Sequence, residues 1–182
     1  MKQTLTLSAL FVCMSTMLFA QQPDAFDTQY KVYKNAMRFY DLQAASNALY
    51  NMIAIKPERE DLNDSLAFIY FAGERYGQAY LLGEEILKKS PEKTDILEVV
   101  AVSKQSLGLT KEALANFESL YQRTKSLYYL YQVATLQYGL QRYGECIASL
   151  DIIIASPDAA TQKINIRNPN NTSQEVPMAC LL

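Results

Sequence analysis

A small residue recurs along this chain at an almost constant interval. Ala45, Ala79, Ala113 and Cys146 follow one another at spacings of 34, 34 and 33 residues. Proline recurs with them, because three of these four positions are each followed by a proline 11 or 12 residues later: Pro57, Pro91 and Pro157. A period near 34 residues predicts a stack of similar supersecondary units, each packed on its neighbours, rather than one globular core.

Each period is expected to form two helices joined by a short turn. In the first helix of the second period, Leu66, Ala67 and Tyr70 share one face, as in a helix with a single buried stripe. Glycine in the following turn is expected to supply the left-handed residue that ends a helix. The recurring small residue then lets the second helix approach the first, and proline ends the unit. These signals place the units at residues 26–59, 60–93, 94–126 and 127–158.

The turns into the second helices resemble those of the tetratricopeptide repeat (TPR) family. The matching stretches are Arg75–Ala79, Thr110–Ala113 and Arg142–Cys146. The chain departs from the family pattern in having no tryptophan, in placing Gly83 where a large aromatic is common, and in lacking a clear turn glycine in the first unit. The resemblance implies an all-α, right-handed α-solenoid of antiparallel helix pairs within residues 21–158.

Residues 1–20 have the layout of a secretory signal peptide. Met1 and Lys2 supply a positive start, Leu5–Phe19 is largely apolar, and Ala20 precedes a polar stretch. The alternative is an uncleaved membrane anchor, for which the apolar run is short. We therefore expect export, with cleavage after Ala20.

Residues 159–182 break the repeat pattern. Ile164–Ile166 alternates like a short strand, and a turn cluster follows at Asn168–Asn171. The apolar residues from Val176 to Leu182 could begin a further repeat. We expect a short irregular or hairpin tail, and a chain truncated at Leu182 is one interpretation of this apolar end.

Charge and composition argue against several functions. Without Lys2 the chain has 16 basic and 19 acidic residues and no basic patch, which disfavours nucleic acid as a partner. Histidine is absent, as are glycine-rich phosphate loops and Cys-x-x-Cys pairs, so we expect no catalytic, cofactor or metal site. An exported chain could join Cys146 to Cys180, but Cys146 is expected instead to be a small buried hydrophobe.

The TPR resemblance also implies a ligand-binding concave face, built by repeat positions 2, 5, 9 and 12 of the first helices. Aromatic and acidic residues at these positions are the candidate partner contacts: Tyr30, Asp61, Asp64, Phe68, Phe71, Asp95, Glu98, Tyr128, Tyr131 and Tyr138. In the alternative interpretation the tyrosines pack between units and the acids are solvated, Asp61 and Asp95 complementing helix dipoles.

These observations predict a non-catalytic protein–protein interaction scaffold or assembly factor of the cell envelope, in the periplasm of a Gram-negative bacterium. Its partner would be a protein or peptide segment, with no small-molecule substrate, and it would touch a membrane only through an uncleaved signal. The acids on the concave face disfavour capture of a free carboxylate. Two alternatives stay open: a docking module of a longer protein, and a glycan-binding envelope protein, which the lack of tryptophan disfavours.

Overall fold

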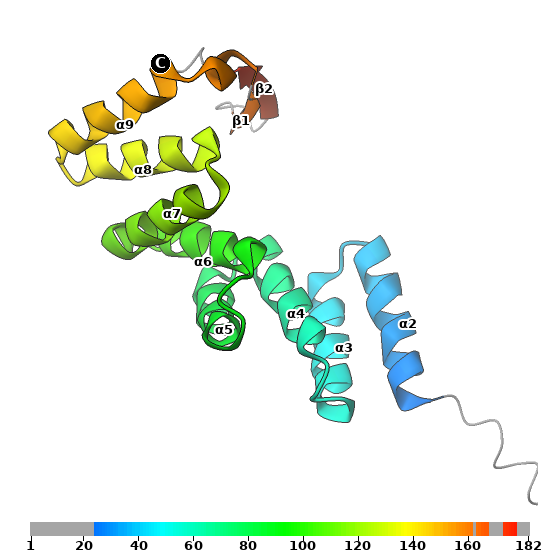
Figure 1. The fold of residues 1–182 in the computed structure, drawn as a ribbon. Helices are drawn as coiled ribbons and strands as arrows, with labels where there is room; N and C mark the ends of the chain where they lie inside the picture. Colours follow the sequence, from blue (N-terminus) through cyan, green and yellow to red (C-terminus); the bar gives the residue numbers. More distant parts are fainter. Residues whose placement is uncertain (1–23, 162, 168–172, 178–182) are drawn as a thin grey trace, which may run out of the picture. The chain divides into compact units, whose positions relative to one another are not determined.

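The computed structural model describes residues 24–161, 163–167 and 173–177, so the predicted signal peptide and Cys180 lie outside the described residues. Helices follow one another along the chain until a short hairpin (Figure 1). The elements are α2 (Ala25–Arg38), α3 (Leu42–Ile55), α4 (Glu60–Ala72), α5 (Tyr76–Lys89), α6 (Thr94–Ser106), α7 (Thr110–Thr124), α8 (Leu127–Gly139), α9 (Tyr143–Ala155), η1 (Pro157–Ala160), β1 (Lys163–Arg167) and β2 (Ser173–Pro177). None of the helices in this described part is both long and apolar enough to cross a bilayer.

The chain divides into two compact units between Leu62 and Asn63, inside α4. In the first unit α2 packs against α3. The second unit contains the rest of α4, the helices α5 to α9, and the C-terminal hairpin. Each unit is described by itself below.

The turns inside the helix pairs correct one prediction. Gly108 is left-handed as expected, with φ +76°, but Gly73 and Gly139 are not. The left-handed residues in those two turns are Glu74 and Gln141, with φ of 56° and 61°. The same backbone hydrogen bond closes each of these turns, in which an amide N–H donates to the carbonyl oxygen five residues earlier. The three bonds run from Arg75 to Tyr70, from Leu109 to Lys104 and from Arg142 to Gln137. This Schellman arrangement fixes the left-handed residue by its hydrogen bonds, so glycine is not required there.

The recurring small residue is buried where paired helices approach. Ala45, Ala79 and Ala113 have no exposed surface, and Cys146 is buried and free. A larger side chain at these positions would push the two helices of a pair apart. The period in the sequence thus marks a packing requirement that each helix pair repeats.

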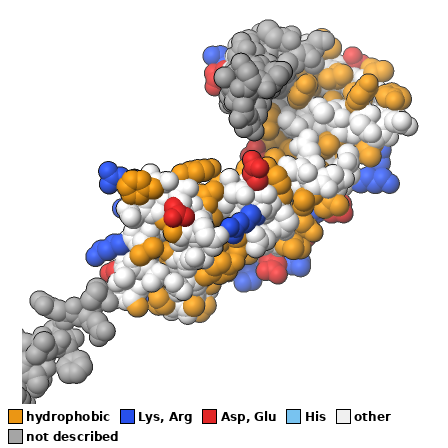
Figure 2. All heavy atoms as spheres, turned by 180° about the vertical axis from the view of Figure 1, so that it is seen from behind, with side chains coloured by type: hydrophobic (Ala, Val, Ile, Leu, Met, Phe, Trp, Pro, Cys, Tyr) orange, Lys and Arg blue, Asp and Glu red, His pale blue; other side chains and the backbone are white. Residues whose placement is uncertain are grey.

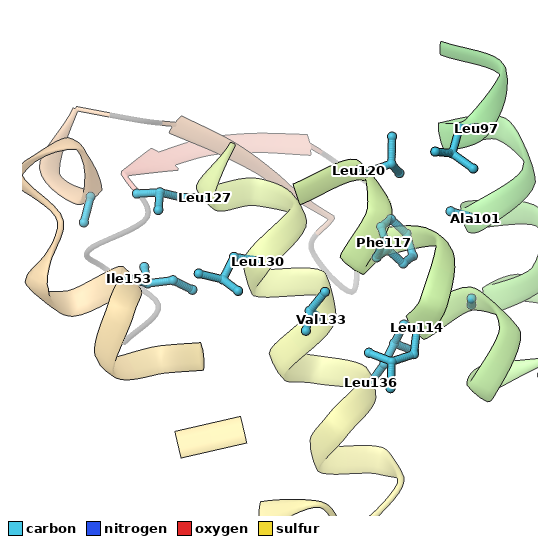
Figure 3. Packing of buried hydrophobic residues seen from close by; sticks show 12 residues of the cluster. Leu97, Ala101, Leu114, Phe117, Leu120, Leu127, Leu130, Val133, Leu136 and Ile153 are labelled. Atoms are coloured by element: carbon cyan, nitrogen blue, oxygen red, sulfur yellow. The ribbon is translucent and has the colours of Figure 1, made fainter. Parts of the chain in front are cut away.

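The core of the second unit is continuous across successive helices. In Figure 3, Leu127, Leu130 and Val133 of α8 lie between Ile153 of α9 and the apolar side chains of α7. Phe117 of α7 is fully buried, and Leu97 and Ala101 of α6 extend the same cluster. Each helix therefore uses one face toward the helix before it and another toward the helix after it, as expected for stacked repeats.

The tail forms the predicted hairpin. Strand β1 pairs antiparallel with β2, with Ile164 opposite Val176. Lys163 and Glu175 form an exposed ion pair at 3.6 Å. Ala159 of η1 is buried in the same cluster as Leu127, which ties the start of the tail to the repeats.

Candidate partner-binding face

The predicted partner contacts fall on the first helices of the repeats. The second unit holds eight of them, with Asp64, Phe68 and Phe71 on α4, Asp95 and Glu98 on α6, and Tyr128, Tyr131 and Tyr138 on α8. Tyr30 and Asp61 lie in the first unit. The candidate face described here is therefore the one formed by the predicted residues of α4, α6 and α8, and we refer to it as the inner face.

Polar side chains join neighbouring first helices on the inner face. Lys93 Nζ donates to both carboxylate oxygens of Asp64, at 2.9 and 2.7 Å. Tyr129 Oη donates to Glu98 Oε2 at 2.8 Å. Two of the predicted acids are thus engaged within the protein, where they link segments 29 and 31 residues apart in sequence.

The tyrosines of α8 form a row in which exposure differs from one end to the other. Tyr128 and Tyr131 are half-buried and pack against the apolar cluster of the unit. Tyr138 is 66% exposed, and its ring meets Tyr143 edge to face at a centroid distance of 5.7 Å. The row therefore presents anchored rings at one end and an exposed ring at the other.

The phenylalanines of α4 divide in the same way. Phe68 is exposed, whereas Phe71 is half-buried and meets Tyr76 of α5 edge to face at 6.0 Å. Asp95, in the first turn of α6, is exposed. Phe68 and Asp95 can therefore contact a partner without displacing a packed neighbour.

The two predicted residues of the first unit lie beside basic groups. Tyr30 is exposed, its ring stacks on Tyr33 at 6.4 Å, and Lys34 Nζ lies 5.7 Å from its centroid. Asp61 accepts two hydrogen bonds from the Arg59 guanidinium, each at 2.7 Å. These hydrogen bonds raise the pKa of Arg59, which stays charged.

Burial raises the pKa of two tyrosine hydroxyls on α8. It is the largest cause of a raised pKa at both Tyr128 and Tyr129. The hydrogen bond to Glu98 raises the pKa of Tyr129 further, and the charge of Glu98 raises that of Tyr128. The hydroxyls of Tyr128 and Tyr129 therefore lose their protons only at a more alkaline pH than a free tyrosine does.

Sequence reasoning missed two contributors to the inner face. Tyr129 occupies the position that Ile96 has in α6, which is buried there, and it was not among the predicted partner contacts. Its ring does pack near Phe117, at a centroid distance of 6.4 Å, but its hydroxyl reaches Glu98. Gln132 accepts a long hydrogen bond from Gln105 at 3.4 Å. The sequence signal that could have identified Tyr129 was the pair Tyr128–Tyr129, which follows the acidic Glu98 by about one repeat.

Among residues 24–161, 163–167 and 173–177, no group of three His, Cys, Asp or Glu side chains could hold a metal ion. A hollow of about 340 Å³ is lined by residues 108–112 and Leu140, and it includes none of the predicted partner contacts. Hydrophobic side chains are spread over both units in the view of Figure 2, with charged ones scattered among them.

Comparisons with known proteins identify the fold. No protein-family model matches the chain, and no curated protein matches its sequence. A solved structure of MamA from AMB-1 is 17% identical, with a TM-score of 0.63 over 79% of this chain and 81% of that one. MamA from Desulfovibrio magneticus RS-1 is 8% identical, with a TM-score of 0.63 over 72% of this chain and 75% of that one. The predicted fold class is thereby confirmed: the chain is similar to MamA in fold, as an all-α, TPR-like solenoid of antiparallel helix pairs.

Proposed function

We propose that this protein is a non-catalytic scaffold that holds a segment of a protein partner along the inner face. The supporting observation is the row of tyrosines on α8, in which Tyr128 and Tyr131 are anchored by packing and Tyr138 is exposed. Tyrosine is favoured at such sites because its ring buries a large area with little loss of conformational entropy, while its hydroxyl can still form hydrogen bonds.

The contacts with the partner divide into two roles. Phe68, Tyr131 and Tyr138 supply apolar area, whereas the protonated hydroxyl of Tyr128 supplies a neutral donor. The exposed Asp95 favours a basic or polar partner segment and raises the association rate more than the affinity. Asp64 and Glu98 hold Lys93 and Tyr129, and they shape the face in this way.

A pull-down from envelope extract tests this function. It compares the wild-type protein with the triple variant Tyr128→Ala, Tyr131→Ala, Tyr138→Ala. Circular dichroism first establishes that the variant is still helical. The control is Tyr50→Ala, which removes an exposed tyrosine from α3. A protein captured by wild type and by the control, but lost from the triple variant, supports the inner face. Equal capture by all three excludes it.

The proposal includes export to the periplasm or cell envelope of a Gram-negative bacterium. Its support is the layout of residues 1–20, with a positive start, an apolar run and a small residue before a polar stretch. The mass of the mature protein, measured after expression in a Gram-negative host, gives the test. A chain that begins at Gln21 in the periplasmic fraction agrees with the proposal, and a full-length chain in the cytoplasmic fraction contradicts it.

A further inference from the structure

Asp64 and Glu98 occupy the same place in successive repeats. Helix α4 begins at Glu60 and α6 at Thr94, so each of the two acids is the fifth residue of its helix. The cation that meets Asp64 comes from the N-cap of the next first helix, which is Lys93. The side chains of Lys93 and Asp64 are only 24% and 22% exposed. In that repeat, a lysine from the following helix therefore neutralises the acid at this position.

The next repeat supplies no such lysine to Glu98. The N-cap of α8 is Ser126, and α8 itself carries no charged residue. Glu98 is half-buried, and no lysine or arginine of the described part of the chain forms an ion pair with it. A carboxylate that is partly removed from water is destabilised unless a cation or hydrogen bonds compensate. Glu98 therefore keeps a charge that the equivalent Asp64 has neutralised.

The two lysines nearest to Glu98 in sequence or on its own helix are engaged elsewhere. Lys125 Nζ donates to Gln122 Oε1 at 3.0 Å and lies 5.4 Å from the centroid of the Tyr121 ring, so it contacts α7. Lys104 of α6 is buried and pairs with carboxylates of α5 and α7. A cation that pairs with Glu98 would therefore come from another molecule.

One oxygen of the Glu98 carboxylate is open to such a ligand. Tyr129 Oη donates to Oε2 at 2.8 Å, and no other described residue donates a hydrogen bond to this carboxylate, which can accept about four. The rings of Tyr128 and Tyr129 meet edge to face at 5.2 Å beside it. Burial, and then the charge of Glu98, raise the pKa of Tyr128, so its hydroxyl lies within the field of that charge. A carboxylate flanked by aromatic rings attracts cations through both groups.

An ammonium group fits this cluster better than a guanidinium group. An arginine fork binds a carboxylate most strongly when it reaches both oxygens, but Oε2 of Glu98 already accepts from Tyr129. An ammonium group is a compact charge that can bind through one oxygen. The bonds from Lys93 to Asp64 show that the equivalent position in the earlier repeat accepts such a group.

We propose that the partner segment places a lysine side chain on the inner face, where its ammonium group binds the Glu98 carboxylate beside the rings of Tyr128 and Tyr129. We refer to these three residues as the ammonium site. The inference rests on the proposed function, because it names one contact that the partner segment makes with the inner face.

The probes for the test are two capped pentapeptides with serine at both ends and leucine on each side of the central residue. The centre is lysine in one peptide and norleucine, which has a similar chain without the charge, in the other. Binding is followed by the amide chemical shifts of isotopically labelled protein. Wild type is expected to bind the lysine peptide at least about fivefold more tightly, as for a charged hydrogen bond that water partly screens. The largest shifts are expected at Glu98 and residues 126–131.

Glu98→Gln removes the charge and keeps an acceptor for Tyr129. This variant is expected to bind the lysine peptide as weakly as the norleucine peptide, and to bind the norleucine peptide as wild type does. The matched control is Glu118→Gln, which removes the same charge from an exposed position on α7. An equal loss in the control would mean a general attraction to the acidic protein, which overturns the proposal.

A lysine placed in the chain competes for the same carboxylate. Ser126→Lys copies the origin of Lys93, and the Ser126 side chain forms no capping hydrogen bond that would be lost. A melting temperature that rises in Ser126→Lys, but not when Glu98→Gln is also present, identifies pairing of the new lysine with Glu98. The paired variant is expected to lose its preference for the lysine peptide. Wild-type affinity for that peptide in the paired variant overturns the proposal.

Failure of this inference is distinguishable from failure of the proposed function. Equal binding of both peptides that is lost in Tyr131→Ala supports a peptide-binding inner face but overturns the lysine contact. Binding of neither peptide also overturns the lysine contact, while the pull-down still decides the proposed function. A third peptide with a central arginine is expected to bind more weakly than the lysine peptide, and tighter binding overturns the choice of an ammonium group.

Discussion

Gly83 is the residue at which helix propensity and packing disagree. Alanine in a helix interior is more stable than glycine by about 1 kcal/mol. At Gly83, however, an added Cβ would lie 2.5 Å from Val100 Cγ2 and 3.5 Å from Ile96. Val100 cannot easily move aside, because a β-branched residue in a helix has one strongly preferred rotamer. Gly83→Ala is therefore expected to lower the free energy of unfolding by about 1–3 kcal/mol, measured by urea denaturation.

Gly77 on the same helix is the control for that substitution. A Cβ built there meets nothing within 4 Å. Gly77→Ala should therefore leave stability unchanged or raise it by up to about 1 kcal/mol. Opposite signs for the two glycines would establish that the close approach of α5 and α6, rather than propensity, selects Gly83. Stabilisation by both substitutions would show that Val100 can shift to make room for a Cβ at position 83.

The hydrogen bond from Tyr129 to Glu98 makes stability depend on pH in the alkaline range. The pKa of Tyr129 is raised by burial and by this bond. Above about pH 10 the unfolded chain releases this proton while the folded chain retains it, so the stability of the wild type falls as the pH rises. Tyr129→Phe lacks this contribution. We expect the variant to be less stable by about 1–2 kcal/mol at pH 8, with the difference shrinking toward pH 11.

Urea denaturation of both proteins at several pH values between 8 and 11 measures this difference. Tyr50→Phe serves as the control, because it removes an exposed hydroxyl from α3. A difference between wild type and Tyr129→Phe that stays constant over the whole range would mean that Glu98 does not hold the Tyr129 proton in the folded state.

Individual side chains were the part of the candidate site that the sequence predicted least. The repeat pattern assigned positions to faces of helices. It could not show that Asp64 bonds Lys93 or that Glu98 bonds Tyr129, because those pairs depend on the length and rotamers of side chains from neighbouring repeats. Glu74 and Gln141 were missed as left-handed residues for a related reason. Their conformation follows from the hydrogen bonds that close each turn, not from their own preference.

At the scale of elements, helix positions were predictable because several local signals coincide. An apolar stripe with helical spacing, a small buried residue and a terminal proline agree on the second helices of three repeats, as for α5 with Ala79 and Pro91. Local agreement of this kind makes a helix prediction robust. The hairpin of β1 and β2 was predictable for a different reason, since short alternating segments flank a turn cluster.

Lys104 joins three successive helices, and its buried stem is expected to matter more than its charge. Its side chain on α6 is 7% exposed and pairs with Glu84 on α5 and Glu112 on α7 at 2.6 and 3.0 Å. Burial alone would lower its pKa, but the bonds to these two carboxylates outweigh that effect and raise it. The side chains of Glu84 and Glu112 are 42% and 58% exposed, so water screens the pairs.

Two substitutions of Lys104 separate the contribution of its aliphatic stem to stability from that of its charge. Lys104→Met keeps apolar contacts and is expected to cost less than about 1 kcal/mol, because the exposed carboxylates remain hydrated. Lys104→Ala also loses the stem and is expected to cost about 2–3 kcal/mol. Thermal denaturation of both variants gives the comparison. Equal losses would mean that the ion pairs, rather than the stem, join the three helices.

At the scale of the molecule, the period in the sequence predicted the fold class but not the division into two units. The first repeat lacks a clear turn glycine, but the division does not fall at its end: it lies between Leu62 and Asn63, inside a helix. No change of composition, glycine or proline marks that point in the sequence. Such a division depends on how strongly each interface between repeats is packed, which a pattern of hydrophobic positions does not measure.

A solenoid in which each repeat contacts only its neighbours should lose stability locally when one repeat is damaged. Phe117 is the largest fully buried side chain among the described residues and belongs to the cluster that spans α6, α7 and α8. Phe117→Ala is expected to cost about 3–5 kcal/mol, because it leaves a cavity that rigid helices cannot close.

Amide hydrogen exchange locates that loss. We expect faster exchange in α6 to α8 of the Phe117→Ala variant, while α2 and α3 keep wild-type protection, since neither contributes to the damaged cluster. Equal acceleration in α2 and α3 would instead mean that the chain unfolds as one cooperative body. In that case each interface between repeats would be more stable than the repeat it joins, and folding would be all-or-none despite the modular architecture.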